Sequence, residues 1–205
     1  MDLSLLLKGL AVGFTVAAPL GPIGLLCIGR TLSNGLSSGL ATGLGAATAD
    51  AIYGCIGGLG VTFLAQALTG RQWWFRLIGG LFLVYLGMRI CHSKPAASER
   101  SADVRALTAS YGSAFLLTLA NPVTIVSFSA IFATFGVGDS KGSYSDAVTL
   151  LAGIFCGSAA WWLILSVSVN WFRRRIRLSS LGWINKVVGA IIAGCGFVAL
   201  ATISV

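Results

Sequence analysis

The sequence predicts an all-α membrane protein, folded as a six-helix transmembrane bundle in a single domain over residues 1–205. Of the 205 residues, 56% are hydrophobic and only 10% are charged, whereas about a quarter of the residues of a soluble domain are charged. A soluble core of this chain length could not bury so much apolar surface. The 27 glycines fit the same class, because small residues let membrane helices approach each other closely.

Apolar stretches long enough to cross a bilayer follow one another along the chain. The six predicted spans are 9–29, 38–66, 73–91, 111–136, 147–172 and 184–204. The polar joints between them are 30–35, 69–72, 92–110, 136–146 and 173–182. None of these joints is long enough for a soluble domain. We expect the first span to be a retained helix and not a signal peptide, because Asp2 opens it and Pro19 and Pro22 occupy the place of a cleavage site.

The distribution of Lys and Arg predicts the orientation of the spans. Ten of the 14 basic residues fall on the side of the joints after spans one, three and five, and four fall on the other side. Because cytoplasmic loops carry the excess of Lys and Arg, we expect the joints 92–110 and 173–182 to be cytoplasmic. Both termini would then lie on the periplasmic side of a bacterial inner membrane.

Two proline motifs predict breaks in the first and fourth spans. Pro19 and Pro22 each remove a backbone donor and clash with the preceding turn, and Gly21 between them permits unusual backbone angles. Asn121 and Pro122 form a similar break in the fourth span. Each break lies near the start of a set of three spans, so the halves 1–91 and 111–205 would be inverted repeats. The alternative for each motif is a simple kink without a function.

Unwound backbone at such breaks exposes carbonyl and amide groups that lipid cannot satisfy. We therefore expect the breaks at Pro19, Gly21 and Pro22 and at Asn121 and Pro122 to bind a polar or charged substrate near the middle of the membrane.

Asp50 is the one acid that we place well inside a span. A charge there costs on the order of 3 kcal/mol, so the carboxyl should face the interior of the bundle or a wet cavity. Such a carboxyl could carry a proton or meet the ammonium group of a substrate. The alternative is a structural carboxyl bonded to a neighbouring helix.

Other chemistries find little support in the composition. There is one histidine, His92, and the five cysteines are scattered over different apolar runs, so we expect no metal site and no His-based nucleophile. The net charge of +8 lies in short joints, which indicates topology control and contact with anionic lipids, not nucleic-acid binding.

Several motifs together are similar to those of the LysE/RhtB family of exporters. In chain order, they are residues 18–25 (APLGPIGL), 43–50 (GLGAATAD), 79–87 (GGLFLVYLG), Asn121-Pro122 and 184–190 (INKVVGA). The resemblance thus extends over nearly the whole chain. It implies export of amino acids, driven by the proton or membrane-potential gradient, without a bound cofactor. Val123 stands where the family often has a lysine after Asn-Pro, so no role for that cation is implied.

The function we expect is secondary active export of amino acids or closely related small amphiphiles. The partners would be the substrate and the lipid bilayer, with a homo-oligomer possible and no nucleic acid. One alternative is a metal-ion permease of the same superfamily. A membrane-embedded enzyme would need a nucleophile with a base, or paired acids, inside the bundle, and Asp50 has no partner of either kind in its span.

Overall fold

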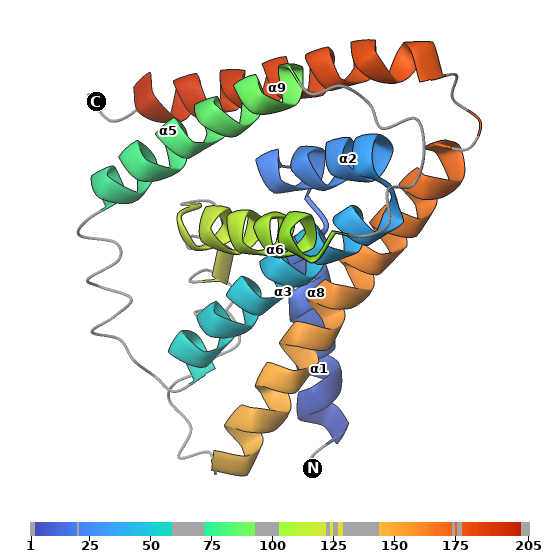
Figure 1. Ribbon diagram of the computed structural model, residues 1–205. Coiled ribbons are helices and arrows are strands. Elements are labelled where there is room, and N and C mark those ends of the chain that lie inside the picture. The colour runs from blue at the N-terminus through green and yellow to red at the C-terminus, as the bar shows by residue number, and fades with distance from the viewer. Residues whose placement is uncertain are drawn as a thin grey trace.

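The computed structural model describes seven helices and no strand in the part of the chain that it places, which is residues 3–19, 21–58, 72–92, 103–121, 124, 127–128, 144–173, 175 and 178–201 (Figure 1). The helices are α1 (Leu3–Ala17), α2 (Pro22–Asn34), α3 (Leu36–Gly58), α5 (Gln72–Cys91), α6 (Val104–Leu119), α8 (Tyr144–Arg173) and α9 (Leu178–Ala201). This confirms the all-α class.

The first predicted span, 9–29, is two helices in the structure. The axes of α1 and α2 differ by 79°, and the change of direction falls at the predicted proline motif. Since Pro22 is the first residue of α2, where its missing N–H costs no hydrogen bond, the motif ends one helix and begins the next. The break that the proline motif predicts in the first span is therefore present between α1 and α2.

Three joints also differ from the prediction, and one of them, 173–182, is helical from Leu178 onward. The joint 30–35 is helical as far as Asn34, and Gly35 alone separates α2 from α3. Gly35 has a φ of 94°, a backbone conformation that glycine adopts without a steric cost. Arg30 therefore lies inside a helix and not in a loop. In the joint 92–110, α6 already begins at Val104. The side chain of Asp103 accepts a hydrogen bond from the Arg105 amide and so caps the helix at this point.

The helices pack in pairs whose two members are far apart in the sequence (Figure 1). The pairs with the most extensive packing are α1 with α8, α5 with α9, α3 with α6 and α3 with α8. The helix α2 lies in the middle and packs on α3, α8 and α9. One group of buried side chains, which includes Leu26, Ala46, Leu117 and Ile192, joins these elements into a common core.

Among the described residues, one segment is by itself long and apolar enough to cross a membrane, namely Val148–Arg173 of α8, and α1 with α2 would give a second span if the bent pair counts as one. Large parts of the predicted second and fourth spans, 59–66 and 129–136, lie outside the described residues. The six-span count therefore stays a prediction.

Candidate functional site

A cavity of about 190 Å³ lies where the break between α1 and α2 meets α3, α8 and the end of α6. Its lining residues are Val16, Ala17, Pro19, Gly21, Pro22, Ile23, Gly24, Asp50, Thr118, Asn121, Thr124, Ser127 and Trp162. We call it the Asp50 cavity. Its volume corresponds to about six water molecules at liquid density, which is the scale of a small organic solute.

The first turn of α2 forms one wall of the Asp50 cavity. Gly21 precedes the helix with a φ of −94° and a ψ of −165°, and no side chain caps the helix there. Its amide donates to the carbonyl oxygen of Pro19 at 2.8 Å, which closes a tight turn at the break. The first amides of a helix have no partner within the helix. This end of α2 therefore presents open N–H groups and the positive end of the helix dipole to the cavity.

Asp50 supplies the negative charge of the cavity. Its side chain is only 3% exposed, and Ser158 Oγ of α8 donates a hydrogen bond to Asp50 Oδ2 at 2.6 Å. Trp162 Nε1, one helical turn further along α8, donates to Ser158 Oγ at 3.1 Å. These two bonds fix the orientation of the carboxyl group. No described residue donates to Oδ1, which leaves that oxygen available to a solute.

The end of α6 forms the wall that contains Asn121. The helix ends at Leu119, and the hydroxyl of Tyr53 donates to the carbonyl oxygen of Leu119 at 2.5 Å. Asn121 donates through Nδ2 to Thr124 Oγ1 at 3.0 Å. This amide is therefore held at the cavity by a residue beyond the end of the helix, as an unwound segment requires for its polar groups.

The structure brings five of the six predicted site residues to this one cavity, namely Pro19, Gly21, Pro22, Asp50 and Asn121. Pro122, the sixth, lies outside the described residues. The two helix breaks thus meet at the same cavity, although they are about a hundred residues apart in the sequence. Their role in binding a substrate stays a prediction.

Sequence reasoning missed the partners of Asp50. Neither Ser158 nor Trp162 was singled out as a site residue. The signal was present, because Ser158, Trp162, Ser166 and Asn170 recur every four residues along α8 and are all buried. A stripe of polar groups at that spacing marks a helix face that is turned toward other protein groups.

The charge of the Asp50 cavity is unbalanced toward the negative. Asp50 is the one charged side chain among the described residues that line the cavity, and no described Lys or Arg lines it. The described part of the chain also contains no group of three or more His, Cys, Asp or Glu residues that could hold a metal ion. A carboxylate and a helix N-terminus in one small cavity can contact a cationic group and an anionic group of the same solute.

Comparison with known proteins identifies the family. The LysE type translocator family matches residues 14–202. The "Putative amino acid efflux protein YcgF" of Bacillus subtilis is 24% identical over 200 residues, which cover 95% of this chain and 94% of that protein. An uncharacterized membrane protein of Pseudomonas aeruginosa is 27% identical over 206 residues, with 95% and 94% covered. No solved structure matches the chain. The match covers both helix breaks, Asp50 and every described helix except most of α1, and the protein therefore belongs to the LysE type translocators, a family of membrane transporters.

Proposed function

We propose that this protein is a secondary active exporter of amino acids or closely related small amphiphiles, driven by the proton or membrane-potential gradient. The observation that carries the proposal is the Asp50 cavity, where a buried carboxylate and the uncapped start of α2 lie together. An amino acid at neutral pH carries one ammonium and one carboxylate group. The ammonium group of the substrate would bind Asp50, and its carboxylate would bind the backbone amides of Ile23 and Gly24.

The hydrogen bonds of Asp50 suit a transport cycle. Ser158 and Trp162 hold the carboxyl in one orientation, so the free oxygen Oδ1 is available to a substrate. When the ammonium group leaves, a proton can neutralise the carboxylate, which lowers the cost of keeping it away from water. Exchange of a proton for a cationic group at one carboxyl couples the two movements. The "amino acid efflux" in the name of the Bacillus subtilis relative agrees with this direction of transport.

The location of the protein follows from the same proposal. We place it in the inner membrane of a bacterium with both termini on the periplasmic side, as the distribution of Lys and Arg predicts. No specific observation in the described residues favours a metal-ion permease or a membrane-embedded enzyme over an exporter.

Cells that are fed dipeptides provide the test of this function. Peptidases release amino acids inside the cell, and an exporter relieves their accumulation. We expect cells that contain the protein to tolerate the dipeptides of its substrate better than cells that lack it, and to release that amino acid into the medium faster. Chromatography of the medium measures the release. If no dipeptide among those of the standard amino acids gives a difference in release, the proposed function is wrong.

A further inference from the structure

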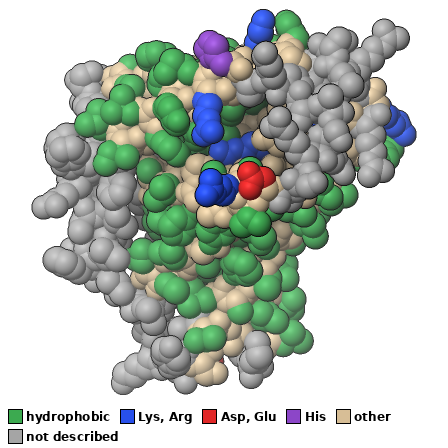
Figure 2. All heavy atoms as spheres, viewed as in Figure 1, with side chains coloured by type: hydrophobic (Ala, Val, Ile, Leu, Met, Phe, Trp, Pro, Cys, Tyr) green, Lys and Arg blue, Asp and Glu red, His purple; other side chains and the backbone are tan. Residues whose placement is uncertain are grey.

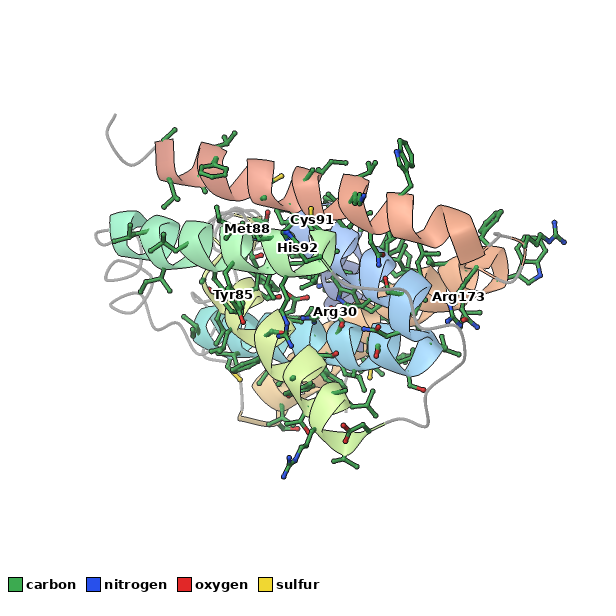
Figure 3. All side chains as sticks on the ribbon, turned by 45° about the horizontal axis from the view of Figure 1, so that its top comes forward. Arg30, Tyr85, Met88, Cys91, His92 and Arg173 are labelled. Atoms are coloured by element: carbon green, nitrogen blue, oxygen red, sulfur yellow. The ribbon has the colours of Figure 1, made fainter. Side chains whose placement is uncertain are left out.

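A second cavity, of about 480 Å³, lies between α2, α5 and α6 and has the opposite charge. Arg30 and Arg89 line it, together with Ser33, Ser113 and Tyr85. Figure 3 shows Arg30 projecting from α2 between the helices, with Tyr85 of α5 nearby. We call it the arginine cavity. Its volume lies in the range that small-molecule sites have.

Arg30 is held rigidly by neutral groups. Nη1 donates to Thr42 Oγ1 at 3.2 Å and to the carbonyl oxygen of Ser110 at 2.8 Å, and Nη2 donates to Ser113 Oγ at 2.7 Å. A guanidinium has more N–H donors than these three bonds use. The remaining donors have no acceptor among the described residues, and the positive charge of Arg30 is oriented but not neutralised.

Arg89 adds a second positive charge to the same cavity. It lies in the last turn of α5, is exposed, and forms no salt bridge with a described residue. The described carboxylates of Asp50, Asp103 and Asp146 all lie outside the lining. Figure 2 shows several Lys or Arg side chains on this face of the molecule, with one acidic side chain directly beside them. Two like charges without a carboxylate among the described lining residues favour the binding of an anion.

The arginine cavity is separate from the Asp50 cavity. They share no described lining residue. Thr42, which binds Arg30, and Asp50 lie eight residues apart on α3, about 12 Å along the helix axis. Leu26, Cys27 and Ala46, which are fully buried, belong to the core between them. One small amino acid therefore cannot occupy both sites at once.

We infer that the arginine cavity is a loading site that binds the carboxylate of the exported solute before the solute reaches Asp50; this inference rests on the proposed function. Two guanidinium groups match the oxygens of a carboxylate, and Tyr85, which also lines the cavity, offers a further hydroxyl donor. Phe82, Leu86 and Leu116 form an apolar wall for a side chain. Ala106 and Ala109 of α6, which also line the cavity, belong to the joint that the sequence predicts to be cytoplasmic, the side from which an exported solute arrives.

Binding of isocaproate to the purified protein in phosphatidylcholine nanodiscs tests the inference. Isocaproate has the carboxylate and the carbon skeleton of leucine without its ammonium group, and isopentylamine has the ammonium group without the carboxylate. We expect isocaproate, and not isopentylamine, to bind in a manner that depends on Arg89. Arg89→Gln should weaken the affinity about tenfold or more, because a charge-assisted hydrogen bond is lost. Arg89→Lys, which keeps the charge without the planar fork, should retain part of it.

Arg105→Gln is the matched control, because Arg105 is an exposed cation near the start of α6 that does not line the cavity. It should leave the affinity unchanged. Equal affinity of the wild type and Arg89→Gln, or an equal loss in Arg105→Gln, would overturn the inference. The unfolding temperature of each variant without ligand shows whether it is folded, and Arg89→Lys provides the test if the Gln variant is not.

Nanodiscs that contain phosphatidylglycerol distinguish the solute from a lipid headgroup. If phosphatidylglycerol weakens isocaproate binding to the wild type but not to Arg89→Gln, a lipid phosphate fills the cavity and the assignment to the solute is wrong. We expect no such difference. The dipeptide experiment separates the two proposals. Export without Arg89-dependent isocaproate binding would contradict the loading site alone. Arg89-dependent isocaproate binding without export would contradict the proposed function.

Discussion

At the scale of single residues, Asp50 shows how the fold tolerates an acid within an apolar span. Insertion of a charged side chain at the centre of a membrane helix costs on the order of 3 kcal/mol. The hydrogen bond from Ser158 offsets part of this cost, since a bond to a charged group contributes about 1.5–3 kcal/mol. Because Ser158 is itself fully buried and bonded to Trp162, the carboxyl is positioned by a supported group.

Removal of the Ser158 hydroxyl should therefore lower stability. Ser158→Ala leaves Asp50 Oδ2 and Trp162 Nε1 without their partner, and we expect a loss of about 1–3 kcal/mol. The unfolding temperature of the purified protein in detergent, followed by tryptophan fluorescence, measures the effect. Ser168→Ala is the control, because Ser168 lies on the same helix with an exposed side chain. Equal unfolding temperatures of the two variants would show that the bond contributes nothing.

At the scale of helices, glycine pairs set how closely the elements approach. Gly9 and Gly13 of α1 face Gly153 and Gly157 of α8, and a Cβ atom at any of the four would collide with the backbone of the other helix. The helices α5 and α9 meet in the same way at Gly87 and Gly189. Contacts of this kind replace the hydrophobic effect between helices in lipid. They also hold α1 against α8, which keeps the break after Ala17 beside Ser158 and Asp50.

A single methyl group should disturb this packing. Gly13→Ala places a Cβ against the backbone of Ile154, so the helices must move apart and we expect a lower unfolding temperature. Gly194→Ala in α9 has open space around the new methyl group. It should keep or raise the unfolding temperature, since alanine favours a helix over glycine by about 1 kcal/mol. If both variants unfold at the same temperature, the close approach of α1 and α8 is not needed for stability.

At the scale of the whole molecule, the helix pairs follow a regular pattern. Suppose that α1 corresponds to α6, α3 to α8 and α5 to α9. When each helix is replaced by its counterpart, the pair α1–α8 becomes α6–α3, and the pairs α3–α8 and α5–α9 stay the same. An inverted repeat of the halves 1–91 and 111–205 would produce this pattern. The repeat stays a prediction, because residues 129–143, within the second half, lie outside the described residues.

The sequence predicted much of the fold and part of the site. Pro19, Pro22 and Asp50 could be identified because a helix breaker or an acid within an apolar run conflicts with its surroundings. Their neighbours could not, since Ser158 reaches Asp50 only through the packing of α8 on α3. Arg30 was placed in a loop because a charge ends an apolar run. Its bonds to Thr42, Ser110 and Ser113 depend on tertiary contacts that the local sequence does not reveal.

The predicted orientation of the whole chain can be measured with single cysteines. In a variant without the five native cysteines, Ser98→Cys and Ser179→Cys should resist a membrane-impermeant thiol reagent in intact cells, because both joints are predicted to be cytoplasmic. Ser140→Cys, in the joint 136–146, should react. All three should react once the membrane is permeabilised. Labelling at Ser98 and Ser179 but not Ser140 in intact cells would reverse the orientation.

Gradient-driven flux through purified protein in vesicles tests the central claim most directly. A pH gradient is imposed, and the movement of the amino acid found in the dipeptide experiment is followed in the wild type and in Asp50→Asn. Asn keeps the size and hydrogen-bonding capacity of Asp, but it carries no charge and accepts no proton. Asp103→Asn, at an exposed helix cap that Asn also favours, is the control and should transport normally. We expect Asp50→Asn to fold with an unfolding temperature near that of the wild type and to lose gradient-driven flux. Normal flux through Asp50→Asn would contradict this expectation and leave Asp50 with a structural role alone.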